Sequence, residues 1–476
     1  MKAGMEWIDA ATAAERLGVK PATLYAYVSR GVLTRRHGDD GRRSLFDAAE
    51  VERLARRGRP RGQPPELVIE SAVTALGPDR PHYRGRDALA LARTAPFETV
   101  AEWLWTGDPA VLAAGGESDA IPPAPVARDG AQPEESDTSP PESRADAGTR
   151  LRAPGPDGDA ADQLRAAGPD GGLADRLWVA GSDGGVADRL WVADPDGVRA
   201  AVAAQRGLPA DPLPIDRLQV ITTVLGASDS LRHQLDPASV AATGRRLVAG
   251  LVGALPPLRE PAGESIPARL WSRLCPHPAT PALLDTLRAA LVLLADHELA
   301  PSTLAARVAA SARADPYAVV LTGLGVLAGP LHGGASYAAE RLLAEVGTPG
   351  AAARVLADRA RRGERVPGFG HSVYKNGDAR GGLLLDLVRQ AVPSHDRTAA
   401  ASAVLAEARR RRLPEPNIDF ALAALTSVTG MVPGAGEAIF AVARTVGWLA
   451  HAMEEYAGGT LLRLRASYTG PPVTGP

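Results

Sequence analysis

The chain has 476 residues, and 53 basic against 55 acidic residues give it a formal net charge of -2. This length exceeds one ordinary hydrophobic core and predicts two or three domains. The near-neutral charge excludes a protein that binds nucleic acid or a membrane through its whole surface. A single cysteine, Cys275, excludes an internal disulfide framework and a cysteine-based zinc cluster.

Apolar residues recur at three- and four-residue spacing through segments rich in Ala, Leu and Arg, among them 284–299 and 302–314. This spacing is typical of amphipathic helices, whereas alternating strand patterns are scarce after residue 75. No segment carries the apolar run of a signal peptide or a membrane-spanning helix. We therefore expect a cytoplasmic protein whose bulk is all-α.

Residues 1–61 form a predicted N-terminal domain, closed by the linker sequence GRPRGQPP. We expect short helices in TAAERLG (12–18) and KPATLYAYVSRG (20–31), each with glycine at its end. LTRRHGDDGRRSLFD (33–47) predicts a two-stranded wing, and Asp47 is expected to cap a third helix. This order resembles the winged helix-turn-helix DNA-binding domain of the MerR and excisionase-like families.

Basic residues outnumber acidic ones in this N-terminal domain, which favours contacts with DNA phosphates. A second helix of this kind would place its exposed side chains in the major groove. The candidate DNA-binding residues are Thr23, Tyr27, Arg30, Arg35, Arg36, Arg42 and Arg43. The alternatives are a small module used for assembly and a degenerate relic.

An insertion is predicted over 109–199. Its first part is rich in Pro, Ser, Asp and Glu, which is typical of disorder. A thirteen-residue repeat follows in ADQLRAAGPDGGL (161–173), ADRLWVAGSDGGV (174–186) and ADRLWVADPDGVR (187–199). Each copy is too short to bury a core of its own. We interpret the repeats as a tandem expansion in a surface loop, with a dedicated partner site as the alternative.

Four segments hold polar groups whose placement is hard to explain by packing alone, and three of the four have a histidine or aspartate beside Gly or Pro: LADHELAPSTLAARV (294–308), GPLHGGAS (329–336), VPGFGHSVYKNGDAR (366–380) and PNIDFAL (416–422). Glycines let the backbone approach a ligand closely, so such groups are more often directed at a cavity than at a helix face. For one histidine alone, a satisfied or exposed side chain is the commoner explanation. Four such segments together indicate an active site.

These segments, in this order, resemble the citrate synthase family. Residues 83–108 are similar to the family's N-terminal region, and FAVARTVGWLAHAMEE and RLRASYTGP are similar to its C-terminal helix and tail. The resemblance covers about 66–108 and 200–474. It implies condensation of acetyl-CoA with oxaloacetate to citrate and free CoA. Asp419 matches the family's base, His332 the donor to the enolate oxygen, and His371 the group that protonates the ketone.

The resemblance also implies a set of substrate contacts. Arginine forks suit the two carboxylates of oxaloacetate, and the partner subunit typically supplies one of them. The matching positions are Arg380, Arg444, Arg463 and His297. For CoA they are Val366, Pro367, Gly368, Phe369 and Gly370, which resemble an adenine-binding loop, with Lys375 as a phosphate contact. No cofactor is implied beyond acetyl-CoA as a substrate, and no metal.

The sequence departs from the family pattern close to these groups. Ala300 and Pro301 replace Asn and Ala, Ser336 and Tyr337 replace Asn and Glu, and Ser372 replaces Arg. Leu464 replaces the proline of an Arg-Pro-Arg tail. None removes a proposed catalytic group, but neighbouring residues hold catalytic ones in place, so these changes bear on rate and acyl preference.

The resulting prediction is a homodimeric, all-α, two-domain citrate synthase-like body behind the N-terminal domain. Its large domain comprises 62–108, 200–333 and 425–476, and its small domain comprises 334–424 and closes over the substrate. Two alternatives stay open. One is a 2-methylcitrate synthase that uses propionyl-CoA, and the other is a DNA-binding regulator whose body senses oxaloacetate or an acyl-CoA.

Overall fold

The computed structural model describes residues 7–17, 19, 23, 24, 27, 28, 33–37, 44–48, 50, 51, 69–114, 191–464, 466, 469 and 470. It divides into two compact units. The first comprises Met1–Glu70 with Arg463–Pro476, and the second, which we call the body, comprises Ser71–Leu462.

The first unit contains a three-stranded antiparallel sheet of order β1-β3-β2 and one described helix. Its elements are β1 (Trp7–Asp9), α1 (Ala10–Leu17), β2 (Arg35–His37) and β3 (Ser44–Asp47). The pairing of β2 with β3 confirms the predicted hairpin, and α1 confirms the first helix. Strand β1 was not predicted. Only Thr23, Leu24, Tyr27 and Val28 of the second predicted helix are described, so the helix-turn-helix stays a prediction.

The body is predominantly helical, as predicted, and carries one small sheet, of order β4-β5-β6. It begins with β4 (Thr74–Leu76), β5 (Pro81–Tyr83), β6 (Arg86–Asp87), α4 (Ala88–Thr94), α5 (Phe97–Thr106) and α6 (Pro109–Ala114). It resumes with α9 (Pro195–Ala204), η1 (Gln205–Gly207), α10 (Pro214–Ser228), α11 (Pro237–Ala254), α12 (Ile266–Leu274), α13 (Pro281–Leu294), α14 (Pro301–Ser311) and α15 (Pro316–Leu327). It ends with α16 (Gly334–Val346), η2 (Pro349–Ala351), α17 (Ala352–Arg361), α18 (Ala379–Ala391), α19 (Asp396–Arg410), α20 (Ile418–Thr429) and α21 (Ala435–Gly458).

A repeated local signal starts many of these helices. A polar residue accepts a hydrogen bond from the first turn, and proline occupies one of the first two helical positions, where no N–H partner is needed. The capping residues of this kind are Asp194, Asp236, Ser265, Thr280 and Asp315. Short stretches of sequence therefore determine where these helices begin.

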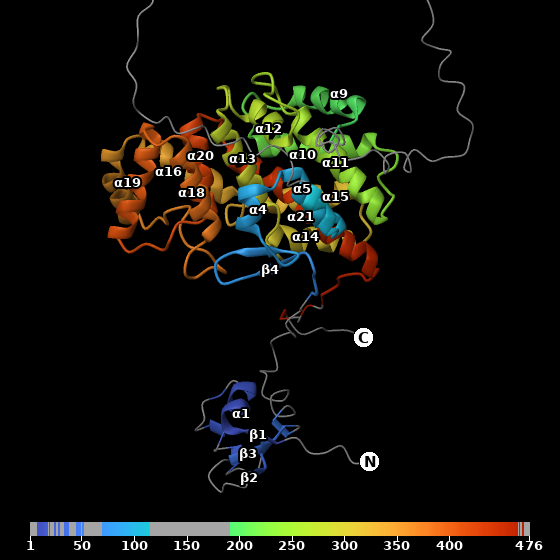
Figure 1. Cartoon of the computed structure of the whole chain (residues 1–476), viewed down its shortest axis with the longest axis vertical. Helices are drawn as coiled ribbons and strands as arrows, with labels where there is room; N and C mark the ends of the chain where they lie inside the picture. Colours follow the sequence, from blue (N-terminus) through green and yellow to red (C-terminus); the bar gives the residue numbers. More distant parts are fainter. Residues whose placement is uncertain are drawn as a thin grey trace, which may run out of the picture. The chain divides into compact units, whose positions relative to one another are not determined.

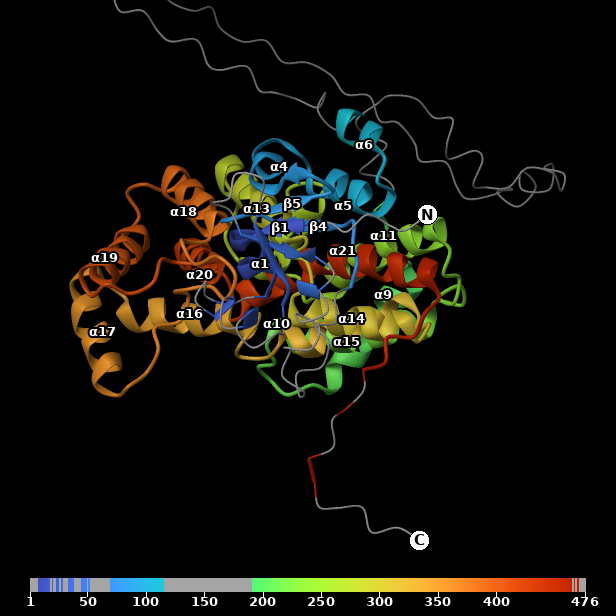
Figure 2. The ribbon, with the colours of Figure 1, turned by 90° about the horizontal axis from the view of Figure 1, so that it is seen from below.

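The long helix α21 runs through the middle of the body and is buried along most of its length (Figure 1). Helices α16, α18, α19 and α20 gather at one end of the body in Figure 1, and Figure 2 shows α17 beside them. Helix α20 packs on α16 and α18. The division of the body into a large and a small domain stays a prediction.

The last copy of the repeat departs from the expected surface loop. Trp191, in this copy, is only 2% exposed and stacks on Trp105 of α5 with ring centroids 5.6 Å apart. Asp194 then caps α9, which includes Pro195. Burial of an aromatic side chain explains the difference, because it adds a core contact that a polar loop lacks. Helices α6 and α9 occupy the two ends of the predicted insertion, and 115–190 lies outside the described residues, so the bounds of the insertion stay a prediction.

Candidate active site

His332 lies in the turn between α15 and α16. Its Nε2 is 2.7 Å from Oγ of Ser302 on α14, and that oxygen accepts a hydrogen bond of 3.2 Å from Nε1 of Trp448 on α21. Burial and then the charge of Arg444 lower the pKa of His332 to about 4. Elements far apart in the sequence therefore hold a histidine that is neutral at pH 7.

Gly323 allows this arrangement. A Cβ at this position would lie 2.6 Å from the indole ring of Trp448, a distance that real side chains do not tolerate. Only glycine lets the ring lie flat against α15 while its Nε1 reaches Ser302. A glycine inside a helix is unfavourable by about 1 kcal/mol relative to alanine, which the close packing offsets.

Asp419 occupies the first turn of α20. Asn417 caps the helix by accepting hydrogen bonds from the backbone N–H groups of Asp419 and Phe420. The hydroxyl of Ser336, on α16, donates a hydrogen bond of 2.5 Å to Oδ1 of Asp419. Burial raises the pKa of Asp419 to about 6, although this hydrogen bond opposes the rise. The carboxyl is ionised at pH 7 and more basic than an ordinary aspartate.

His371 follows the loop 366–370. Its Nδ1 accepts hydrogen bonds from the backbone N–H groups of Val373 at 3.0 Å and Tyr374 at 3.2 Å. A neutral imidazole that accepts at Nδ1 carries its proton on Nε2. Burial, followed by the charge of Arg380, lowers the pKa of His371 to about 4. The ring also stacks on Tyr374, with centroids 4.7 Å apart.

Arg380 forms a buried ion pair with Asp378, the residue that caps α18. Its Nε and Nη2 each donate a 2.9 Å hydrogen bond to this carboxylate, and Nη2 also lies 3.5 Å from Nε2 of His371. Asp378 in turn accepts the backbone N–H of Ile418, next to Asp419. Burial disfavours the charged form of each residue, but the ion pair outweighs this effect, so the pKa of Asp378 is lowered and that of Arg380 is raised. One carboxylate thus ties the His371 loop to the start of α20.

Arg444 is a buried cation with an incomplete set of partners. Its side chain is 1% exposed, and Nε donates to the carbonyl of Leu294 at 2.9 Å. Nη1 and Nη2 are buried and have no hydrogen-bond partner among the described residues. Burial lowers the pKa of Arg444 to about 10, so the guanidinium stays charged at pH 7. Two unsatisfied charged donors are costly to bury, and they indicate a site for an anion.

His297 lies after α13 and is buried. Its Nε2 is 3.0 Å from the hydroxyl of Tyr374, and its ring meets that of His371 edge-on, with centroids 5.3 Å apart. Burial, then the charges of Arg380 and Arg444, lower its pKa well below the usual value. The structure therefore brings His297 and His371 into contact, and the charge of Arg380 acts on both rings.

The loop Val366–Gly370 is fastened to the segment that precedes Asp419. Asn417 N–H donates to the carbonyl of Gly368 at 2.9 Å, and its side chain donates to that of Gly370 at 2.8 Å. Gly368 has φ +82°, and a Cβ there would lie 2.7 Å from that of Phe420, so glycine is required. Lys375 is exposed and lines a cavity of about 200 Å³ with His371, Gly370 and Asn417.

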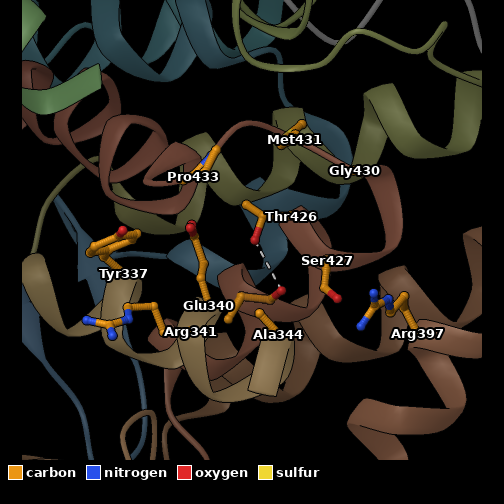
Figure 3. A pocket seen from close by; sticks show the side chains of 11 residues that line it. Tyr337, Glu340, Arg341, Ala344, Arg397, Thr426, Ser427, Gly430, Met431 and Pro433 are labelled. Carbon is orange, nitrogen blue, oxygen red and sulfur yellow. Dashed lines mark hydrogen bonds between the residues drawn. The ribbon is translucent and has the colours of Figure 1, made fainter. Parts of the chain in front are cut away.

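A larger cavity, of about 330 Å³, lies between α16, α20 and the loop before α21, and none of the predicted site residues lines it (Figure 3). Glu340, on α16, points into it. Its two carboxylate oxygens accept the backbone N–H groups of Gly434 at 2.8 Å and Gly436 at 2.7 Å. Burial raises the pKa of Glu340 to about 7 despite these donors.

The remaining predicted residues belong to the first unit. Arg463 is exposed in the segment after α21, and its unit is separate from the body. Thr23, Arg35 and Arg36 are exposed, Tyr27 is half-buried, and the guanidinium of Arg36 lies 5.2 Å from the ring centroid of Trp7. Arg30, Arg42 and Arg43 lie outside the described residues. The DNA contacts and the dimer contact stay predictions.

Within the described ranges, no cluster of three or more His, Cys, Asp or Glu side chains has a geometry that would hold a metal ion. Among the same residues, no helix has the length and apolar character needed to cross a bilayer.

Sequence reasoning missed several neighbours of the predicted groups: Ser302, Trp448, Tyr374 and Asp378. Ser302 and Trp448 meet only through the packing of α14 on α21, so no local pattern identifies them. Asp378 carried a usable signal, because aspartate is a preferred residue at the position just before a helix.

The sequence resemblance is confirmed by comparison with known proteins. Residues 195–465 match the family described as citrate synthase, C-terminal domain. Citrate synthase 2 of Bacillus subtilis is 33% identical over 272 residues, which span 54% of this chain and 73% of that protein. 2-methylcitrate synthase 2 of Corynebacterium glutamicum is 28% identical over 281 residues, spanning 55% and 73%.

The fold is similar to that of a solved citrate synthase from Thermoplasma acidophilum, determined as a ternary complex with carboxymethyl coenzyme A and oxaloacetate. The TM-score is 0.59 at 19% identity, and the match covers 86% of this chain and 96% of the solved chain. At this identity the comparison supports the fold alone. Together with the family match, it leads to one conclusion: the chain belongs to the citrate synthase family and is an acyltransferase of the citrate synthase type.

Proposed function

We propose that this protein condenses acetyl-CoA with oxaloacetate and hydrolyses the resulting thioester to citrate and CoA. The observation that carries this proposal is the buried guanidinium of Arg444, whose Nη1 and Nη2 have no hydrogen-bond partner among the described residues and lie beside a cluster of neutral histidines. A carboxylate satisfies both donors and the charge at once, because its two oxygens match the guanidinium fork. Oxaloacetate supplies two carboxylates of this kind.

Arg380 and His297 complete the proposed oxaloacetate site. Arg380 is held by Asp378 through Nε and Nη2, which fixes the plane of its guanidinium without neutralising all its donors. His297 contributes a neutral ring beside that of His371. Arg463 is proposed to serve the site of the other subunit in a homodimer, and residues 334–424 are proposed to close over the substrate as a small domain.

Asp419 is the proposed base that removes a proton from the methyl group of the acyl donor. Its pKa of about 6 keeps it ionised at pH 7 yet closer to the operating pH than an ordinary aspartate, which favours proton transfer. The C–H bond breaks, an O–H bond forms on the carboxylate, and the electron pair moves to the thioester oxygen as an enolate.

His332 is the proposed donor to this enolate oxygen. Because Trp448 donates to the hydroxyl of Ser302, that hydroxyl is free to donate to Nε2 of His332. The imidazole proton then sits on Nδ1, available for the developing negative charge. Leu331, next to His332, is 95% exposed and offers an apolar surface for the acyl donor.

His371 is the proposed acid for the ketone of oxaloacetate. Its Nε2–H donates to the ketone oxygen and supplies a proton as the carbon-carbon bond forms. Water then cleaves the thioester. The loop Val366–Gly370 is proposed to receive the adenine of CoA, and Lys375, at the rim of the adjoining cavity, a phosphate group.

Two further functions have an observation in their favour. A relative named 2-methylcitrate synthase matches at nearly the same coverage as the citrate synthase relative, so propionyl-CoA is the second candidate donor. Strand β2 exposes Arg35 and Arg36, which favours binding of DNA phosphates and a regulatory role beside the enzymatic one. Replacing both arginines by Gln should weaken a salt-dependent gel shift; an unchanged shift would exclude β2 as the contact.

The deciding experiment is a thiol-release assay on the full chain with oxaloacetate and either acetyl-CoA or propionyl-CoA. The donor with the higher kcat/KM identifies the substrate. Asp419→Asn should lower kcat by a factor of about 10² to 10⁴. Asp386→Asn, an exposed position on α18, is the matched control and should retain full activity. A folded protein that releases no CoA from either donor would overturn the proposal.

A further inference from the structure

We propose that Ser336 is the positioning residue for Asp419: its hydroxyl holds one carboxylate oxygen and leaves the other to accept the substrate proton. This inference rests on the proposed function, because it assigns a role to Asp419 as base. The supporting contact is the 2.5 Å hydrogen bond from Ser336 Oγ to Asp419 Oδ1. Oδ2 has no hydrogen bond among the described residues.

The position of Ser336 is rigidly defined. The side chain is 0% exposed, and its backbone N–H donates to the carbonyl of Gly333 at 2.9 Å. On the far side, a Cβ built on Gly436 of α21 would lie 3.6 Å from that of Ser336. The hydroxyl is therefore confined between α20 and α21, and a confined donor loses little rotamer entropy when it binds the carboxylate.

One turn of helix connects this donor to the proposed enolate site. Ser336 follows His332 by four residues, and the backbone N–H of Ala335 donates to the carbonyl of His332 at 2.9 Å. The same turn thus carries the proposed enolate donor and the group that fixes the base. Proton abstraction requires both to meet one acyl group, so their shared turn sets the distance between them.

The serine is a departure from the family pattern, which usually has asparagine here. A serine hydroxyl rotates to donate to a carboxylate, whereas an asparagine side chain brings an acceptor oxygen together with its donor. In this chain the short side chain reaches Oδ1 directly. Ser336 therefore holds Asp419 through a single hydroxyl donor.

The charged groups that act on the Asp419 carboxyl are Arg380, which favours its ionised form, and Asp378, which opposes it. Because these two form an ion pair, their effects partly cancel. Of the groups that lower the pKa of Asp419, the Ser336 hydroxyl has the largest effect, and only burial, which raises the pKa, has a larger one. Removal of the hydroxyl should therefore shift the ionisation of Asp419 to higher pH.

The first test is the pH profile of kcat/KM for Ser336→Ala. The acid limb should move up by roughly one pH unit, and the plateau kcat should fall about tenfold because the carboxylate loses its orientation. Ser336→Asn restores a donor and should return the limb toward its original position. Ser427→Ala is the control, because Ser427 lies on α20 about two turns beyond Asp419. An acid limb that stays in place in Ser336→Ala would overturn the proposal, whatever the plateau.

A second test needs no turnover and separates this proposal from the proposed function. The Tm difference between the wild type and Asp419→Asn, followed against pH, has its midpoint at the Asp419 ionisation. The same difference in a Ser336→Ala background should have its midpoint at higher pH. A shifted midpoint supports the role of Ser336 even if no CoA is released, in which case only the proposed function fails. Coincident midpoints would refute the role of Ser336.

Discussion

Ser302 and His332 are joined by a hydrogen bond of 2.7 Å, although α14 and the turn before α16 are connected through the whole of α15. Trp448 donates to the same hydroxyl from a third helix. The protonation of the imidazole is thus set by residues that never touch the substrate in the proposed mechanism. Such a contact has measurable consequences for rate.

Ser302→Ala should lower kcat about tenfold and leave the KM for oxaloacetate unchanged, because the lost hydrogen bond acts on the enolate donor alone. Steady-state thiol release measures both constants. Ser311→Ala, on the same helix, removes a hydroxyl that bonds only to backbone groups and is the control. A kcat equal to that of the wild type would show that Ser302 does not orient His332.

The rate should depend on pH through Asp419. The carboxylate is the reactive form, so kcat/KM should rise with pH, reach half of its plateau near pH 6, and stay level above pH 7. His332 and His371, with pKa values of about 4, are neutral over this range and add no limb. A pH profile of thiol release checks this. A half-maximum near pH 4 would mean that burial does not raise the pKa of the base.

Asp419→Asn should also change stability. The folded pKa of about 6 exceeds the unfolded value of 3.8, so the wild type loses stability as pH rises through this window. The variant escapes this loss and should be more stable at pH 8, by up to about 3 kcal/mol. Near pH 3 the difference should vanish. Chemical denaturation at both pH values measures it, and a variant that is less stable at pH 8 would contradict the expectation.

Arg444→Met should separate stability from ligand binding. It removes a buried charge with two donors that are unpaired among the described residues, so the substrate-free protein should gain about 1 to 3 kcal/mol of stability. Oxaloacetate should raise the Tm of the wild type and leave that of the variant unchanged. Arg389→Gln, at an exposed position on α18, should keep the full ligand effect. A ligand-induced Tm shift in Arg444→Met would show that Arg444 does not bind the substrate.

Glu340→Gln should reduce the pH dependence of stability. The folded pKa of Glu340, about 7, exceeds its ordinary value of 4.5, so its contribution is present below pH 4.5 and is lost as pH rises through 7. The wild type should exceed the variant in stability by about 1 to 2 kcal/mol more at pH 5 than at pH 9. Glu437 lies nearby with a pKa raised to about 7 by burial, and Glu437→Gln measures its own contribution to the pH dependence of stability. Equal differences at both pH values would contradict the expectation.

The groups predicted from sequence share a visible local signature. His332 and His371 stand among glycines, and Asp419 follows an asparagine cap, so short motifs single out these positions, while their catalytic roles come from the family resemblance and stay a prediction. Ser302 and Tyr374 were not predicted, because their roles depend on helices that meet only in the folded chain. The strands β4 to β6 were also missed: two or three residues are too few to display an alternating pattern. The burial of Trp191 was not predicted, because its repeat has the composition of a loop.

Helix α16 begins just after His332, anchors Asp419 through Ser336, and grips the start of α21 through Glu340. These positions follow one another at intervals of four residues and so share one side of the helix. A single inserted residue after His332 would turn the later two by about 100° and break both contacts together. The four-residue spacing of His332, Ser336 and Glu340 therefore fixes both contacts together, and substitutions at these positions should show strong non-additivity.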